Sequence, residues 1–149
     1  VDLCENAMQD EWSTDIGVGC KYFSQDAVIK LAPAAGIALD ETLSPAEKLK
    51  VVQALMEKDD PGAQAIFETI GAYLAYTVVL YSQFYDIEHM MMLGRVMSGK
   101  GGDTILRVCN EILADEYHAL ARKCEVSLPD EKTRRVGQSV AAASLPRIR

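Results

Sequence analysis

A glycine-rich segment holds the residues whose types and spacing could do chemistry. It covers residues 94–102 and lies between a short apolar run, Ile87–Leu93, and a helical pattern that begins at Asp103. A strand, a glycine-rich loop and a helix in this order can bind phosphate, because free backbone N–H groups and the positive end of the helix dipole attract an anion. The sequence therefore directs attention first to anion binding at this loop.

The same segment matches the first seven positions of the P-loop pattern G-x-x-x-x-G-K-[ST], from Gly94 to Lys100. The eighth position is Gly101, so the hydroxyl that would hold Mg²⁺ is missing. A P-loop also opens a multi-stranded domain, whereas only one further strand pattern follows here. Both observations disfavour a true P-loop, and a plain structural turn is the other interpretation that the residues leave open.

Length, composition and charge favour a single domain and exclude some partners. The 149 residues are 49% hydrophobic and 25% charged, which is ordinary for a globular domain with its own core. The net charge of −7 argues against nucleic-acid binding, which requires a basic patch. The four cysteines are widely spaced and no secretory signal precedes them, so we expect reduced thiols and a cytoplasmic protein.

An uncharged run from Thr69 to Tyr85 could be mistaken for a membrane span. It is shorter than the roughly 20 apolar residues that a span needs, and it contains Ser82, Gln83 and four tyrosines. We therefore expect a buried helix and no membrane partner.

Hydrophobic periodicity and capping residues predict a mostly helical chain. Ser24 can cap a helix that ends at Pro33, and Ser44 with Glu47 forms a capping box before a second helix. The predicted helices cover residues 24–32, 45–58, 63–84, 103–123 and 133–144. Asp103 is expected to cap the fourth of them.

Two short apolar runs, Ile87–Leu93 and Glu125–Leu128, are predicted strands. The first is expected to be covered on both faces, as in a parallel sheet, with Met90, Met91 and Met92 packed in the core. Two strands make a poor sheet alone. We therefore expect an α/β domain whose first strands belong to a larger protein.

Four motifs, read together, resemble the ROK (repressor, open reading frame, kinase) family of sugar kinases. Leu93-Gly94 with Ser98-Gly99 is similar to the family's LGGGVS-x-G loop, and Gly19-Cys20 with Ser24 and Ala27 is similar to GC-x-E…S-x-x-A. Residues 60–80 resemble the family's GD-x-x-A helix, and residues 136–143 resemble its closing x-G-A-A-x-x-A helix. The resemblance covers about Asp15 to Ser144.

This resemblance implies a fold and an activity. Residues 1–149 would form one domain, a predominantly helical α/β portion of the C-terminal lobe of an actin-like ATPase (ribonuclease H-like) fold with about two strands. The whole protein would phosphorylate a hexose with ATP and Mg²⁺, as a glucokinase does, and a homodimer would be in keeping with the family. The nucleotide-contacting residues implied are Gly94, Arg95, Ser98 and Gly99.

The chain departs from the family pattern at its loop and at its zinc motif. Arg95 replaces a glycine, so its side chain would either crowd the nucleotide or pair with a phosphate. Of the motif C-x-C-G-x-x-G-C-x-E only Gly19-Cys20 remains, with Tyr22 in place of the glutamate that helps to hold the sugar. We therefore expect no zinc, an altered sugar site, and Cys20 as a small buried residue.

The family's D-x-G-G-T, N-x-D-A and E-x-G-H segments do not occur in this sequence. No catalytic residue is therefore assigned, and the chain alone is expected not to transfer phosphate, because that step needs both positioning and charge neutralisation. His89 and His118 are expected to be structural or solvated. Two other classes remain: a non-catalytic sugar-sensing regulator of the same fold, and a helical interaction module that docks through residues 63–84.

Overall fold

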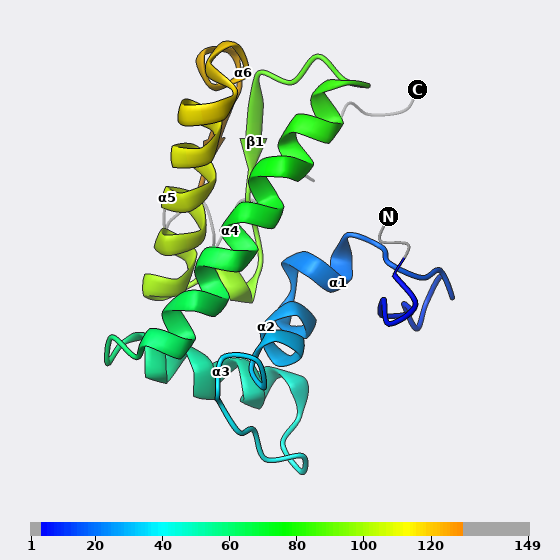
Figure 1. The fold of residues 1–149 in the computed structure, drawn as a ribbon, viewed down its shortest axis with the longest axis vertical. Helices are drawn as coiled ribbons and strands as arrows, with labels where there is room; N and C mark the ends of the chain where they lie inside the picture. Colours follow the sequence, from blue (N-terminus) through cyan, green and yellow to red (C-terminus); the bar gives the residue numbers. More distant parts are fainter. Residues whose placement is uncertain (1–3, 130–149) are drawn as a thin grey trace, which may run out of the picture.

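A computed structural model describes residues 4–129, and its helices surround one long central helix (Figure 1). The elements are α1 (Cys20–Phe23), α2 (Gln25–Leu31), α3 (Pro45–Met56), α4 (Pro61–Ser82), β1 (His89–Met91), the 3₁₀ turn η1 (Arg95–Met97), α5 (Gly99–Glu116), α6 (His118–Lys123) and β2 (Glu125–Ser127). The chain is thus a mostly helical α/β fold with two parallel strands, as predicted. The predicted helix at 133–144 lies outside the described residues.

The predicted helix starts are confirmed at two places. The Ser24 side chain accepts the Asp26 N–H at the start of α2. At α3 the Ser44 hydroxyl accepts the Glu47 N–H while the Glu47 carboxylate accepts the Ser44 N–H, which is the reciprocal capping box. Helix α4 begins at Pro61, two residues before its predicted start, and Asp60 caps it with a 2.9 Å bond from the Ala63 N–H. Side-chain capping therefore sets these helix starts locally.

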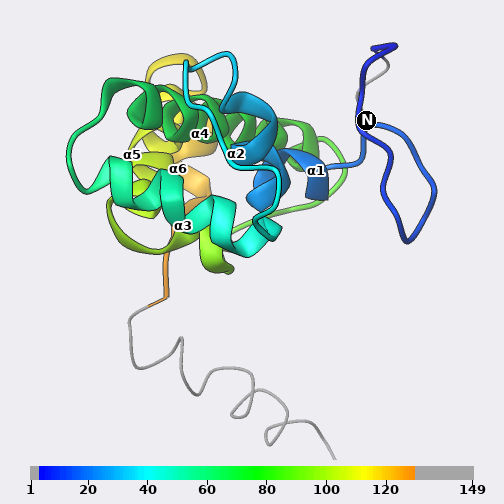
Figure 2. The ribbon, with the colours of Figure 1, turned by 90° about the horizontal axis from the view of Figure 1, so that it is seen from below.

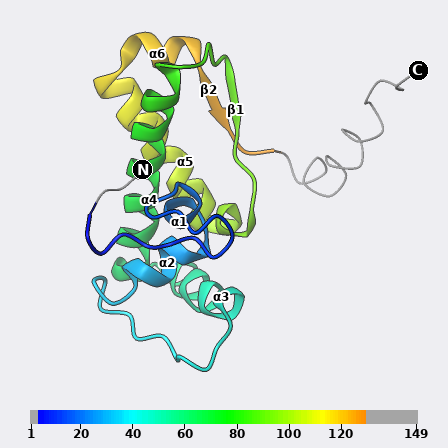
Figure 3. The ribbon, with the colours of Figure 1, turned by 90° about the vertical axis from the view of Figure 1, so that its right-hand side faces the viewer.

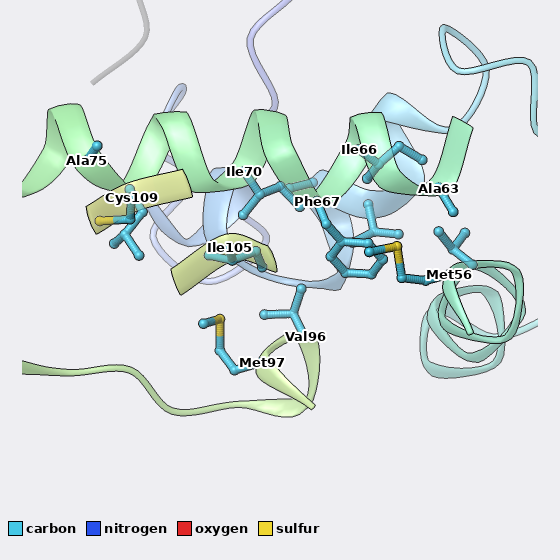
Figure 4. Packing of buried hydrophobic residues seen from close by; sticks show 14 of the residues in the cluster. Met56, Ala63, Ile66, Phe67, Ile70, Ala75, Val96, Met97, Ile105 and Cys109 are labelled. Atoms are coloured by element: carbon cyan, nitrogen blue, oxygen red, sulfur yellow. The ribbon is translucent and has the colours of Figure 1, made fainter. Parts of the chain in front are cut away.

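The core lies between α4 and its neighbours. One face of α4 buries Ile66, Ile70, Leu74 and Val78, and the ring of Phe67 is fully buried. Figure 4 shows the ring of Phe67 extending from α4 toward Met56 of α3 and Val96 of η1. Helix α5 makes the most extensive contact with α4, and α1, α2 and α3 also pack on it. The long helix is therefore the element that the others share.

The second half of α4 is covered on one face only. Tyr76, Leu80 and Tyr81 are each more than 40% exposed, on the side away from the core. By length and composition α4 is also the one helix among the described residues that could cross a membrane, and under half of its most apolar stretch is buried. The predicted helix is thus buried along one face within residues 4–129, and the expectation of no membrane partner stays a prediction.

Strands β1 and β2 pair in parallel, with His89 opposite Glu125 and Met90 opposite Val126 (Figure 3). Val126 is buried and Met90 partly so, but Met91 is 55% exposed. The predictions that this strand is covered on both faces and that all three methionines lie in the core are therefore wrong. The reason is that, within residues 4–129, only helices on one side cover the two-stranded sheet.

Helix α5 begins at Gly99, one turn before the predicted start, so Asp103 lies inside the helix and does not cap it. Two glycines of its first turn pack directly against other parts of the core. A Cβ atom on Gly101 would lie 2.6 Å from the Phe67 ring, and one on Gly102 would lie 2.1 Å from the Met97 carbonyl oxygen. The sequence suggested a loop because glycine is common in loops, whereas here its lack of a side chain permits close packing.

Replacing Gly102 with alanine tests this packing. Alanine favours a helix over glycine by about 1 kcal/mol, yet here its Cβ would collide with backbone. We expect Gly102→Ala to lower the free energy of unfolding by about 2 kcal/mol or more, measured by urea denaturation followed by circular dichroism. The control is Gly19→Ala, because its Cβ would meet only the edge of the Phe23 ring at 3.2 Å. Equal stability of the Gly102 variant and the unaltered protein would contradict the packing role.

The four cysteines fall into two pairs by exposure. Cys109 and Cys124 are buried, and burial raises the pKa of the Cys109 thiol to about 12. Cys4 and Cys20 are exposed. The expectation that Cys20 is buried is therefore wrong, because α1, on which it lies, sits at the edge of the helical body.

Thiol labelling checks this division. The thiolate is the reacting species. At pH 8 a disulfide reagent should therefore react with Cys4 and, more slowly, with Cys20, because burial and the bond to the Asp10 carboxylate raise the pKa of the Cys20 thiol. Cys109 and Cys124 should react only after urea is added. A variant carrying Cys4→Ser and Cys20→Ser should show no fast reaction. Fast labelling of a third thiol in the native protein would show that the α5–β2 region opens.

Candidate functional site

A cleft of about 490 Å³ lies where the N-terminal segment approaches the turn after β1. One wall comes from Asp10, Glu11 and Trp12 and from α1 and α2; the other comes from Leu93–Val96. The structure thus brings two of the predicted nucleotide contacts, Gly94 and Arg95, to the cleft. The other two, Ser98 and Gly99, lie on the far side of the turn, toward α3.

Two buried side chains and two backbone hydrogen bonds fix the turn after β1. Gly94 has φ +125° with open space around its α-carbon, so the position requires glycine for its backbone angle. Val96 and Met97 are buried in the core beneath it. The Met97 N–H donates to the Gly94 carbonyl and the Ser98 N–H to that of Arg95, both at 3.2 Å. Arg95 is therefore carried on a fixed backbone.

Helix α3 holds the same turn from the side. The Gln53 amide donates to the carbonyl oxygen of Arg95 at 2.9 Å and to that of Ser98 at 3.5 Å. Glu57 accepts the Lys100 N–H at 3.2 Å, which places a carboxylate at the N-terminus of α5. Sequence reasoning missed both residues because they lie more than 40 positions before the turn that they contact.

Lys21 holds the other wall of the cleft. Its side chain is only 4% exposed, and its ammonium lies 2.5 Å from Glu11, 2.8 Å from Asp26 and 3.9 Å from Asp10. Hydrogen bonds to Asp26 and Glu11 raise the pKa of Lys21, and the bond from Lys21 lowers the pKa of Glu11. Nothing in the sequence distinguishes Lys21 from a solvated lysine, so only the fold identifies it.

Residues 9–16 form a hairpin-like loop at the cleft, and this loop projects beyond the helices (Figure 2). Its ends pair at Gln9 and Ile16, and the Asp10 N–H donates to the Asp15 carbonyl at 2.9 Å. The Asp10 carboxylate accepts the backbone N–H groups of Trp12 and Ser13, and the latter bond is the main reason that its pKa is lowered. The loop is thus an ordered structure with Trp12 at its tip.

The positions of the family's zinc motif serve other purposes here. The Cys20 thiol lies 3.5 Å from an Asp10 carboxylate oxygen. Tyr22 packs edge-on against Tyr73 at 5.7 Å between ring centroids, with the Lys30 ammonium 5.2 Å from its ring. Within residues 4–129, no three His, Cys, Asp or Glu side chains are grouped so as to hold a metal ion. The expectation of no zinc stays a prediction.

The two histidines lie away from this cleft. His118 is exposed at the start of α6. His89 lies 3.5 Å from Glu125 across the strand pair, and both residues line a separate surface depression. The sequence could exclude a pair between His89 and its neighbour Glu88 but could not find Glu125, because that contact depends on strand register.

No protein-family model matches the chain, and no curated protein or solved structure is significantly similar to it. The family resemblance and the nucleotide contacts therefore stay predictions. A function for this chain has to be inferred from the cleft, the turn after β1 and the residues that hold them.

Replacing Lys21 tests whether it fixes the N-terminal wall. The lowered pKa of Glu11 stabilises the fold above the ordinary carboxyl range of about pH 4, and this stabilisation is lost as the pH falls through the folded-state value. Lys21→Met should therefore lower the urea midpoint at pH 7, and the midpoint should then fall less between pH 5 and pH 2. It should also lower the fluorescence anisotropy of Trp12, because the loop is released.

The matched control is Lys58→Met, which removes the same charge from an exposed position just after α3. This variant should keep the pH dependence and the anisotropy of the unaltered protein. An unchanged anisotropy in Lys21→Met would show that the loop is held without this lysine.

Proposed function

We propose that this chain is the nucleotide-side, C-terminal part of an ATP-dependent hexose phosphotransferase of the ROK type, with the C-terminal lobe of an actin-like ATPase fold. The observation that carries the proposal is the position of Gly94 and Arg95, which follow the carboxyl end of β1 and line the cleft. In open α/β sheets ligands bind outside the carboxyl ends of the strands. The predicted nucleotide loop therefore lies where such a ligand would bind.

Arg95 supplies the charge for this role. Its side chain is exposed at the cleft, and no ion pair joins it to any residue between 4 and 129. A guanidinium without a carboxylate partner can take a phosphate with two parallel hydrogen bonds. Of the two alternatives for Arg95, pairing with a phosphate is thus better supported than crowding of the nucleotide.

The remaining parts of a nucleotide site are the other two predicted contacts, Mg²⁺ and the proton acceptor for the sugar hydroxyl. Ser98 and Gly99 stand at the start of α5, before Lys100, whose ammonium lies 2.9 Å from Asp59. Mg²⁺ is usually held by substrate phosphates, one or two carboxylates and water, so it would arrive with ATP. The proton acceptor for the sugar hydroxyl is assigned to another part of the protein, and the chain alone should release no ADP.

A second candidate is a sugar-sensing regulator of the same fold that binds its ligands without turnover. The contact that favours it is the Glu57 carboxylate at the N-terminus of α5, because this helix start already has an anion. The two candidates differ in turnover by the protein that contains this chain. Binding of ATP and glucose without glucose-dependent ADP release would favour the regulator.

Replacing Arg95 tests the nucleotide site. Arg95→Ala should weaken binding of Mg–ATP about tenfold, the effect of losing about 1.4 kcal/mol of charge-assisted hydrogen bonding. The measurement is calorimetric titration with glucose present. Arg122→Ala is the control, because Arg122 is also exposed but lines the separate depression near His89. No binding by the unaltered protein at millimolar ATP would overturn the proposed function.

A further inference from the structure

We propose that Trp12 is the surface against which the ring of the cleft's second ligand packs, and that this ligand is a neutral polyhydroxylated ring. The inference rests on the proposed function, in which that ligand is the hexose. It adds a recognition residue that belongs to none of the motifs carrying the family resemblance. It depends on three observations: the exposure of Trp12, the anchoring of its loop, and the chemistry of the cleft beside it.

The indole of Trp12 is 95% exposed, more than any other large hydrophobic side chain among the described residues. Single exposed apolar side chains are common on proteins. Tryptophan, however, has the largest apolar surface of all, and it is enriched where one molecule recognises another. A fully exposed tryptophan at the edge of a cleft therefore suggests a binding role more strongly than an exposed leucine would.

Hydrogen bonds within the loop and an ion pair to α1 anchor the loop that carries Trp12. Asp10 accepts the N–H groups of Trp12 and Ser13 at 3.2 and 2.8 Å, and the Thr14 N–H returns to the Asp10 carbonyl at 3.0 Å. Glu11 then ties the loop to the buried Lys21. Since the backbone is fixed before any ligand arrives, little conformational entropy is lost when a ring packs on the indole.

The cleft next to Trp12 offers acceptors for hydroxyl groups. Three carboxylates line it, from Asp10, Glu11 and Asp26, together with the polar side chains of Ser24 and Gln25. Each carboxylate has about four lone-pair sites, so those already bonded to the protein can still accept from a ligand. This wall therefore suits a molecule that presents several O–H donors.

The charge of the same wall disfavours a phosphate. Its three carboxylates outnumber the two cations of the cleft, Lys21 and Arg95, and Lys21 is already paired with the acids. Only Arg95, on the opposite wall, has a free positive charge. The geometry thus separates the cleft into an anion-binding side at Arg95 and an acidic, hydroxyl-binding side at Trp12, which is the arrangement that a phosphate donor and a sugar acceptor require.

A pyranose fits the Trp12 side chemically. One face of such a ring presents C–H groups, which carry partial positive charge, and the indole face carries the negative part of its quadrupole. The hydroxyls at the ring edge would then reach the carboxylates of the cleft. Trp12 would recognise the ring, and the acids would select the orientation of its hydroxyls.

Trp12 is the only tryptophan in the chain, so its emission reports on this position alone. Glucose, titrated without nucleotide, should produce a saturable blue shift of that emission. Trp12→Ala should weaken glucose binding about tenfold by calorimetry, and Trp12→Phe should recover part of the loss, as expected for an aromatic contact of about 1 kcal/mol or more. Affinity for Mg–ATP should not change in either variant.

Ile16→Ala is the matched control, because Ile16 is the other exposed apolar residue of the same loop. It should leave glucose binding unchanged. Equal glucose affinity in Trp12→Ala with no emission change would overturn this inference, while binding of Mg–ATP in the same sample would leave the proposed function standing. An emission shift with adenosine and none with glucose would also overturn it, and absence of binding by either ATP or glucose would overturn both proposals.

Discussion

Helices α4 and α5 approach each other so closely that at two positions only a hydrogen atom fits between them. A Cβ on Gly71 of α4 would lie 2.9 Å from the Ile105 carbonyl oxygen, and one on Gly101 of α5 would penetrate the Phe67 ring. This contact places the start of α5 against the middle of the core. Because Gly102 meets the Met97 backbone in the same way, the turn after β1 is fixed to that helix start.

The candidate site depends on this packing through a short chain of contacts. With α5 in place, Gln53 and Glu57 of α3 reach the carbonyl and N–H groups of the turn and the helix start. The turn then presents Arg95 toward the cleft from a rigid backbone. The opposite wall is held independently by Lys21, whose ammonium joins the N-terminal loop to α2 through carboxylates on both. Two anchors from different parts of the chain thus create one cleft.

The two walls differ in the ligands that they can accept. A guanidinium without an internal partner attracts an anion, while carboxylates around a paired lysine accept hydroxyl donors and repel phosphate. A molecule that brings a phosphate donor next to a polyol needs this separation, because one wall cannot favour both ligands. At the start of α5 the Glu57 carboxylate lies next to the predicted phosphate contacts Ser98 and Gly99, so its negative charge also affects which ligand can bind there.

The sequence by itself determined those features that depend on neighbouring residues. Ser24, and Ser44 with Glu47, set helix starts through bonds that close within four positions, and periodic apolar residues gave the buried faces of α3 and α4. The two short strands also followed from local pattern. The loop at Gly94–Ser98 could be singled out because glycine and apolar runs are visible in one dimension.

Only the tertiary structure decided what depends on residues far apart in the chain. In the sequence Gly101 and Gly102 suggested a loop. In the structure they lie in the first turn of α5, where the Phe67 ring and the Met97 backbone occupy the space that their side chains would need. The Cys20 thiol, expected to be buried, is exposed, whereas the ammonium of its neighbour Lys21 is buried, since three carboxylates converge on it. Which residues share the cleft with Arg95 was likewise decided by packing, because Trp12 lies 83 positions before it.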